Sequence, residues 1–410
     1  MLFVACLSVA AVAVSAAPLE SRAEAIALPL RKHSNVTSIN NIVQKGHARI
    51  SAINGEQAAP ATRAVEVSSG TVTNEDVSYV APVTIGGKTY DLIVDTGCEF
   101  FSKRTPETIP TDAERCTASN TWCGAQSACE KSSTGKSTGG SVSVSYGSGS
   151  FSGTEYTDTV SFGGLTVSSQ SIGSASTASG FSGVDGIFGF GPVGLTQGTV
   201  SNANTVPTFL DNLKSQGSIS TEVLGVSFKP ESGSDTDDAN GELTLGGTDS
   251  SKYTGTLTYF AKLTSGTASA YWGISIASFT YGSQTLASSA SGIVDTGTTL
   301  IYIPSSAYSA FLSATGGKTD SSSGLAVFTT KPTANFGIKF GSTTYTLTPA
   351  QYLVPTAQYS VFGLTSGKYY AWINDGGSSG VNTIIGQKFL ENYYSVYDTT
   401  NSRIGFATAA

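Results

Sequence analysis

Two aspartates occupy the same short motif at two places in the chain. DLIVDTG at 91–97 and SGIVDTG at 291–297 each carry an aspartate after an apolar run, followed by Thr-Gly, and the two aspartates, Asp95 and Asp295, are 200 residues apart. An aspartate at the end of a strand places a carboxylate at a loop tip, where Thr offers a hydroxyl to hold the turn and Gly lets the backbone approach closely. Two such turns in matching contexts indicate an internal duplication.

A duplication predicts that the two turns meet across a pseudo-twofold axis. Two carboxylates about 3 Å apart cannot both ionise cheaply, so they share a proton and titrate as a pair. One carboxyl then takes a proton from water while the other gives a proton to a carbonyl oxygen. The pattern therefore predicts amide hydrolysis in acid without a covalent intermediate.

The positions of histidine and cysteine exclude other hydrolytic chemistries. Both histidines, His33 and His47, lie in the first 65 residues. The rest of the chain therefore has no Ser-His-Asp triad, Cys-His pair or histidine-ligated zinc. The irregular spacing of the cysteines favours disulfides over the alternative of a four-cysteine zinc site, and we expect no metal and no cofactor. The five cysteines are Cys6, Cys98, Cys116, Cys123 and Cys129.

The composition predicts an all-β protein large enough for two lobes. The chain has 410 residues, of which 12% are charged and 39% hydrophobic. Short β-branched and aromatic runs, such as GELTLGG and TGTLTYF, alternate with Gly- and Ser-rich turn segments. Long helical periodicity is scarce.

The N-terminal region differs from the rest of the chain. Residues 1–16 are apolar and end in small residues, which is typical of a signal peptide and predicts a secreted, extracellular protein. Residues 1–65 hold six Lys/Arg and three Glu, whereas the remainder holds 16 Lys/Arg and 26 Asp/Glu. A basic leader on an acidic body predicts a prosegment, 17–65, that is held by charge and released in acid. The alternative is a disordered basic arm.

The same features argue against two kinds of partner. The acidic body has no basic stripe or interleaved aromatic cluster, so we expect no nucleic-acid partner. No segment is suited to cross a membrane, and residues 1–16 are too short and wrongly flanked to do so.

Several stretches resemble the pepsin-like aspartic proteases over about residues 78–407. Within that family, GSGSFSGTEYTDTV, YWGI and YSVYDTTN are similar to the secreted fungal enzymes of the polyporopepsin type. The resemblance implies a bilobal all-β fold in which two pseudo-twofold-related lobes, 66–248 and 249–410, flank a central cleft. The stretches that carry it include the two Asp-Thr-Gly motifs, VSVSYGSGSFSG, GVDGIFGFG, LGGTDSSKYTGTLTY and IIGQKFLENYYSVYDTTNSRIGFA.

The resemblance implies roles for individual residues. Asp95 and Asp295 would be the catalytic pair that holds the attacking water. Tyr146 would close over a polypeptide substrate as part of a flap, an interpretation that the Gly-Ser-Gly after it favours over the alternative of an ordinary strand aromatic. Asp185 matches a structural position. The remaining implied residues are the supports Thr96, Gly97, Thr296, Gly297, Thr298 and Trp122 and the flap residues Gly147, Ser148 and Gly149.

The family also implies a zymogen in which a basic residue of the leader blocks the aspartates. We assign this role to Lys45, with Lys32 and Arg31 as alternatives. A disulfide between Cys123 and Cys129 would close a short loop. We expect a monomer whose partners are its own prosegment and polypeptide substrates.

Residues 98–118 differ in composition from their surroundings. Seven of these 21 residues are charged, and they separate Gly97 from SNTW at 119–122. Cys98-Glu99 can be encoded as T-GTGAG and Thr117-Ala118 as ACAG-CN. Joining T to CN gives a Ser codon and the in-frame product Asp-Thr-Gly-Ser-Ser-Asn-Thr-Trp. Our hypothesis is that 98–118 is a translated intron.

The alternative is a genuine insertion, tied by a disulfide between Cys98 and Cys116. It would loosen the first aspartate loop and the support of Tyr146 by Trp122. The chain would then be a catalytically impaired, peptide-binding relative. A secreted carbohydrate-binding β protein is a third possibility, but it leaves the duplicated motif unexplained.

Overall fold

The protein is described here by a computed structural model, and its elements are mostly strands, which confirms the predicted β class. The predicted signal peptide and the end of the predicted prosegment lie outside the described residues. The structure describes residues 26–34, 38–55, 77–98, 102–103, 121–122, 130–146, 149–179, 184–231 and 240–410.

The largest sheet joins strands from both ends of the chain. It has 13 strands among the described residues, in the order β13-β25-β24-β11-β12-β1-β2-β3-β10-β4-β9-β8-β7. Its strands are β1 (Ile26–Ser34), β2 (Val77–Ile85), β3 (Lys88–Asp95), β4 (Ser102–Lys103), β7 (Lys136–Tyr146), β8 (Gly149–Phe162), β9 (Leu165–Ser179), β10 (Gly186–Gly189), β11 (Val223–Ser227), β12 (Gly241–Leu245), β13 (Tyr253–Ala261), β24 (Tyr393–Asp398) and β25 (Arg403–Ala409).

A second sheet belongs to the C-terminal half of the chain, residues 249–410. Its order is β20-β19-β14-β15-β23-β16-β22, and two smaller sheets, β17-β18-β21 and β5-β6, complete the described strands. Their bounds are β5 (Thr121–Trp122), β6 (Glu130–Lys131), β14 (Gly273–Tyr281), β15 (Gln284–Val294), β16 (Ile301–Ile303), β17 (Lys318–Thr319), β18 (Ala326–Phe328), β19 (Phe336–Phe340), β20 (Thr343–Leu347), β21 (Tyr369–Ala371), β22 (Ile373–Asp375) and β23 (Ile384–Ile385).

Helices are short apart from two. The α-helices are α1 (Ile39–Ile53), α2 (Phe209–Ser215), α3 (Ser305–Thr315), α4 (Pro349–Tyr352), α5 (Tyr359–Phe362) and α6 (Gln387–Leu390), and the 3₁₀ turns are η1 (Val193–Thr196), η2 (Ser250–Lys252), η3 (Thr267–Ala270) and η4 (Thr356–Gln358). No helix among the described residues has the length and apolar character needed to span a membrane.

The strands that lead to the two aspartates are buried because their sequences are apolar. In β3, Tyr90, Leu92 and Val94 alternate along the strand and all three side chains lie in the core. The last two residues before Asp295, Ile293 and Val294, are buried on both faces of β15. Each aspartate therefore follows a stretch of strand whose apolar side chains are buried in the core.

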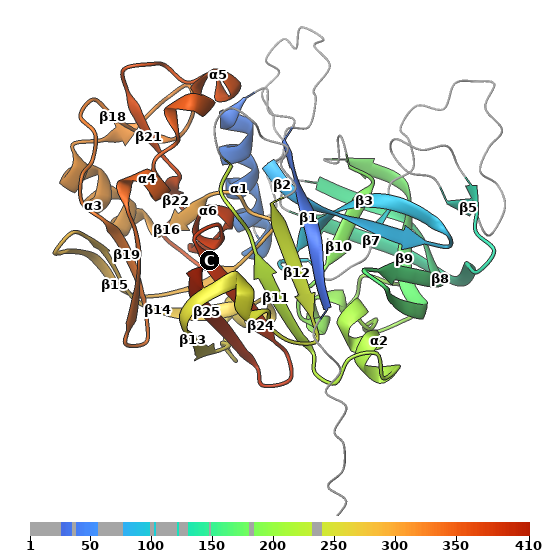
Figure 1. Cartoon of the computed structure of the whole chain (residues 1–410). Coiled ribbons are helices and arrows are strands. Elements are labelled where there is room, and N and C mark those ends of the chain that lie inside the picture. Colours follow the sequence, from blue (N-terminus) through green and yellow to red (C-terminus); the bar gives the residue numbers. More distant parts are fainter. Residues whose placement is uncertain are drawn as a thin grey trace, which may run out of the picture.

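The leader is part of the fold. Strand β1 lies in the main sheet, paired antiparallel with β12 through its first half and with β2 through its second half. Helix α1 follows and stands between the green elements of the N-terminal half and the orange and red elements of the C-terminal half (Figure 1). Backbone pairing as well as charge thus holds the leader, whereas the sequence predicts charge alone.

Candidate active site

The two Asp-Thr-Gly turns meet and hold each other by reciprocal hydrogen bonds. The backbone N–H of Thr96 donates to Thr296 Oγ1 at 2.9 Å, and the N–H of Thr296 donates to Thr96 Oγ1 at 3.0 Å. The Thr296 hydroxyl in turn donates to the carbonyl of Val94, and the Thr96 hydroxyl to that of Val294. Both threonine side chains are fully buried, so these bonds fix the two turns rigidly against each other.

The two glycines permit the close approach of the turns. A Cβ atom on Gly297 would lie 2.4 Å from Asp95 Oδ2, and a Cβ atom on Gly97 would lie 2.8 Å from Asp295 Oδ1. Each glycine therefore sits against the carboxylate that the other turn carries. The two contacts are reciprocal, and any larger residue at 97 or 297 would push the carboxylates apart.

Each carboxylate is also held by its own turn. Gly97 N–H donates to Asp95 Oδ1 at 2.8 Å, and Gly297 N–H donates to Asp295 Oδ1 at 3.0 Å. Asp95 is 3% exposed and Asp295 0% exposed. Two buried carboxylates with fixed orientations form a site in which the protonation of one depends on the charge of the other.

The turns differ immediately after the glycine. Thr298 Oγ1 donates a 2.6 Å hydrogen bond to Asp295 Oδ2. The corresponding position in the first turn is Cys98, whose thiol lies beside Asp95 and 3.8 Å from Arg49 Nη2. A thiol is a weaker donor than a hydroxyl, so the first carboxylate is held less firmly.

A cation from the leader lies between the carboxylates. The guanidinium of Arg49, in α1, donates from Nη2 to Asp95 Oδ1 at 2.7 Å and to Asp295 Oδ1 at 3.0 Å. Its Nη1 lies 3.0 Å from Asp95 Oδ2, and its Nε lies 2.6 Å from Asp295 Oδ2. The planar fork of arginine can engage two carboxylates at once, which the ammonium of lysine cannot do with the same geometry. Arg49 thus occupies the position predicted for the blocking residue of the leader.

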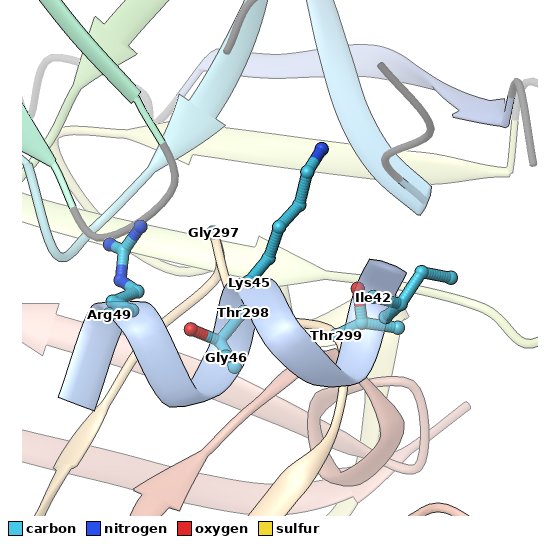
Figure 2. Close-up of a pocket in the computed structure, with 7 residues that line it drawn as sticks. All are labelled: Ile42, Lys45, Gly46, Arg49, Gly297, Thr298 and Thr299. Atoms are coloured by element: carbon cyan, nitrogen blue, oxygen red, sulfur yellow. The ribbon is translucent and has the colours of Figure 1, made fainter. Parts of the chain in front are cut away.

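The assignment of this role to Lys45 was therefore wrong. Lys45 lies one helical turn before Arg49, and its side chain ends away from the Arg49 guanidinium (Figure 2). Arg31, one of the alternatives, forms an exposed ion pair with Asp91 at 2.9 Å. Lys32 lies in β1, where its backbone pairs with Tyr79, and its side chain is outside the described part of the structure.

Burial and Arg49 set the electrostatics of the pair in opposite ways. Burial raises the pKa of Asp295 to about 6, with the Asp95 charge adding to the rise and Arg49 opposing it. Burial also acts to raise the pKa of Asp95, but the charge and hydrogen bonds of Arg49 hold that pKa below its usual value. With the leader in place, Asp295 is therefore the carboxyl of the pair that protonates first as the pH falls.

Helix α1 places Arg49 by packing an apolar face on the C-terminal half. Ile42, Val43 and Ile50 are buried in a cluster with Tyr302. The Tyr302 hydroxyl donates to the carbonyl of Val43 at 3.0 Å, and a Cβ atom on Gly46 would overlap that hydroxyl. The absence of a side chain at Gly46 lets the helix lie directly on Tyr302. This contact brings the next turn of the helix, and with it Arg49, over the aspartates.

Arg49 lines two small pockets. One is lined by Lys45 and Gly46 of α1 together with Gly297, Thr298 and Thr299 (Figure 2). The other is lined by three residues of α1, by Gly97 and Cys98 of the first turn, by Ser145 of β7 and by Tyr271; the α1 residues are Arg49, Ala52 and Ile53. The leader helix therefore occupies the space in front of the carboxylates.

The predicted flap lies partly outside the described residues. Strands β7 and β8 form an antiparallel hairpin, and Tyr146 and Gly149 face each other at its end. Gly147, Ser148 and the side chain of Tyr146 are not described. The same holds for the side chain of Trp122, although its backbone forms β5.

Other predicted features have mixed outcomes. Cys123 and Cys129 are outside the described residues, so their disulfide stays a prediction. Cys98 carries a buried thiol, which contradicts the disulfide to Cys116 that the insertion alternative included. Asp185 accepts a hydrogen bond from the backbone of Asp91 and supports the strand before the first turn, away from the carboxylate pair. No group of three or more His, Cys, Asp or Glu side chains in the described ranges is arranged to hold a metal ion.

The chain belongs to the eukaryotic aspartyl protease family, which it matches over residues 78–409. It is an aspartic-type endopeptidase by this membership.

Among characterised relatives, polyporopepsin from Irpex lacteus is 47% identical over 349 residues, which cover 82% of this chain and 96% of that protein. Aspergillopepsin-1 from Aspergillus oryzae is 31% identical over 419 residues, covering 99% of this chain and 98% of the relative. The crystal structure of the aspartic proteinase from Irpex lacteus superposes with a TM-score of 0.75 at 40% identity and covers 94% of this chain and 98% of that one. The predicted resemblance is thereby confirmed.

Proposed function

We propose that this chain is the precursor of a secreted endopeptidase that acts in acid and uses Asp95 and Asp295 to activate water. The observation that carries the proposal is the convergence of both carboxylates on one arginine nitrogen, 2.7 and 3.0 Å away. Stability of the two turns does not require that both buried carboxylates point toward the same nitrogen atom. A site that does so is suited to share a proton between them.

The proposed chemistry begins when Arg49 leaves. The carboxyls then face each other with one proton between them, and a water molecule takes the place of the guanidinium. The ionised carboxyl accepts a proton from this water as it attacks the peptide carbonyl, and the protonated carboxyl donates to the carbonyl oxygen. The hydrogen bonds from Gly97, Gly297 and Thr298 keep the carboxylates oriented through the reaction.

The leader acts as an inhibitor that acid removes. Arg49 favours the ionised form of Asp95, whose pKa it lowers, so the docked leader stabilises a deprotonated carboxylate. As the pH falls through the range in which Asp95 protonates, this attraction is lost and the leader is released. Strand β1 and the apolar face of α1 hold the leader at neutral pH.

The remaining features follow the family pattern. We infer two lobes, 66–248 and 249–410, with a substrate cleft between them, where a polypeptide lies extended and pairs its backbone with the flap. Tyr146 to Gly149 form the flap tip, and Trp122 supports Tyr146. The predicted signal peptide at 1–16 directs secretion, and the enzyme is monomeric with no metal or cofactor.

The test is cleavage of casein after acidification of the full-length precursor. We expect activity near pH 3–5 that pepstatin abolishes, and a loss of at least about 100-fold in Asp95→Asn and in Asp295→Asn. Asp185→Asn is the matched control, because Asp185 contacts backbone away from the site, and it should leave the specific activity of the folded fraction nearly unchanged. Peptide binding without turnover in the unaltered chain would instead support the impaired, peptide-binding relative.

A further inference from the structure

Each half of the molecule has a short inner strand that is separated by one strand from the strand that carries its aspartate. In the C-terminal half this inner strand is β16, which lies between β23, its antiparallel partner, and β22, its parallel partner. In the N-terminal half it is β4, which lies between β10, antiparallel, and β9, parallel. The two slots have the same neighbours in the same directions, as expected from a duplication.

The register of the two slots corresponds residue by residue. Ser102 pairs with Ile187, which pairs with Ile93. Tyr302 pairs with Ile384, which pairs with Ile293. Because Ile93 and Ile293 each precede their aspartate by two residues, Ser102 is the structural counterpart of Tyr302. The same counting makes Lys103 the counterpart of Ile303.

The two slots are filled by very different sequences. All three residues of β16, Ile301, Tyr302 and Ile303, are 0% exposed. An inner strand with neighbours on both sides favours a continuous apolar run of this kind. Strand β4 instead contributes Ser102 and Lys103, residue types that are rarely buried. The N-terminal slot therefore holds a segment whose chemistry does not suit it.

A suitable segment lies shortly downstream. Thr121 and Trp122 form β5, which pairs outside the main sheets with Glu130 and Lys131. Replacing residues 98–118 by one serine, the product that the genetic code permits, shortens the chain by 20 residues. Trp122 then falls at the place of Ser102 and becomes the counterpart of the buried Tyr302.

The same replacement corrects a second position. The single serine directly follows Gly97 and becomes the counterpart of Thr298, whose hydroxyl holds Asp295. A hydroxyl replaces the Cys98 thiol beside Asp95. A shortening suggested by the family resemblance and permitted by the codons thus places a hydroxyl and an aromatic residue at two positions defined by strand register.

We propose that residues 98–118 are absent from the functional enzyme, and that Trp122 is the positioning residue that fills the inner strand slot of the N-terminal half. In the chain as translated, Ser102 and Lys103 occupy this slot in its place. The consequence is a first aspartate loop anchored by the wrong strand, with Asp95 supported by a thiol.

The experiment compares three full-length precursors. The first is the unaltered chain, the second has 98–118 replaced by one serine, and the third has 98–118 deleted outright. The third is the matched control, because it differs from the second by one residue and a shift of one residue turns each strand side chain to the opposite face. Melting temperature, acrylamide quenching of tryptophan fluorescence and acid protease activity are measured on each.

We expect the serine-replaced chain to melt about 5 °C or more above both others. Its fluorescence should be less accessible to acrylamide, and this change reports on Trp122, because Trp272 and Trp372 are both only 2% exposed already. Its acid activity should exceed that of the unaltered chain by about tenfold or more. Equal gains in the deleted control, or no gain in the replaced chain, would overturn the proposal.

A second comparison covers the case in which the deleted control does not fold. Trp122→Ala should lower the melting temperature strongly in the serine-replaced chain and by less than about 1 °C in the unaltered chain. Equal effects in both chains would contradict the assignment of Trp122 to the slot. Mature transcripts or secreted peptides that span Glu99 to Thr117 would contradict the absence of 98–118.

The activity readout rests on the proposed protease function, whereas melting temperature and fluorescence do not. A serine-replaced chain that gains stability and buries Trp122 but stays inactive would contradict the proposed function and leave the slot assignment in place. A serine-replaced chain that is active but gains neither stability nor burial of Trp122 would support the proposed function and contradict the slot assignment.

Discussion

The loops after Asp95 and Asp295 begin alike and then diverge. Up to the glycine they are near copies, with reciprocal threonine hydrogen bonds and the same N–H donors to the carboxylates. From the next residue on, the second loop continues with Thr298 and a buried apolar strand, whereas the first continues with Cys98 and β4.

The difference separates two requirements of the site. The turns themselves bring the acids together, and they do so even where the following strand is poorly suited to its slot. The residues after the turn then set how firmly each carboxylate is held and how its protonation responds. The duplicated motif therefore brings the two carboxylates together. The different residues that follow each motif set the hydrogen bonds and the pKa of each carboxylate.

The largest effect on activity is expected from a substitution that changes one of the two Asp-Thr-Gly turns and leaves the other as it is. In Gly297→Ala the new methyl would lie 2.4 Å from Asp95 Oδ2, so the carboxylates must separate, and kcat/KM should fall by about 100-fold. Gly194→Ala is the control, because that position has open space around it. Comparable activity in the two variants, measured on a peptide substrate at acid pH, would show that the turns do not approach as described.

The next effect concerns the cation that contacts both halves. Arg49→Leu should raise the rate of precursor activation at pH 6 by about 30-fold or more, because a buried, hydrogen-bonded charge is lost from the docked leader. Arg31→Leu removes the same charge from an ion pair whose side chains are 46% and 47% exposed, and it should change the rate less than about fivefold. If general attraction between a basic leader and an acidic body dominates, the two variants will instead behave alike.

A smaller effect is expected on the pH dependence of kcat/KM, which should change differently when the residue after each glycine is replaced. Thr298→Val removes a donor to the ionised form of Asp295, so the pKa of that carboxyl rises and the alkaline limb of kcat/KM moves up by about one pH unit. Cys98→Ser gives Asp95 a stronger donor, which lowers its pKa and moves the acid limb to lower pH. The pH profiles of kcat/KM for the two variants test whether each substitution moves a different limb. Movement of the same limb in both variants would contradict the prediction.

The smallest effect involves a leader residue whose contacts lie in the C-terminal half alone. His47 of α1 packs edge-on against Tyr302 at 5.4 Å, and burial lowers its pKa below 6.5, opposed by Asp375 and by a hydrogen bond with Asn374. The released leader therefore binds a proton more readily than the docked one, and docking weakens as the pH falls below about 6.5.

Replacing the imidazole by a ring that does not titrate should remove this contribution. The midpoint pH of activation in His47→Phe is expected to fall by less than about one unit, measured as the pH that gives half-maximal activation in a fixed time. An unchanged or higher midpoint would assign acid sensing to the aspartates alone.

The sequence predicted the β class and the meeting of the two turns because both follow from local patterns. Apolar strands leading to a repeated Asp-Thr-Gly need only the duplication to bring Asp95 and Asp295 together. The leader strand β1 also had a local signal that the charge argument passed over. Its Ile26, Leu28 and Leu30 alternate along the chain, as in a half-buried strand.

The identity of the blocking cation could not be predicted in the same way. Lys45 and Arg49 are four residues apart on one helix and project from the same side, so periodicity does not separate them. The choice depends on where the helix rests, and that is decided by the contact of Gly46 with Tyr302 from the other end of the chain. The occupant of the β4 slot was unpredicted for a similar reason, because strand order is a tertiary property.

The most direct test of the account is a crystal structure of the intact precursor at neutral pH. We expect the guanidinium of Arg49 to lie within hydrogen-bonding distance of both Asp95 and Asp295, as it does at 2.7 and 3.0 Å here. Carboxylates that point apart, or a different leader residue between them, would contradict it.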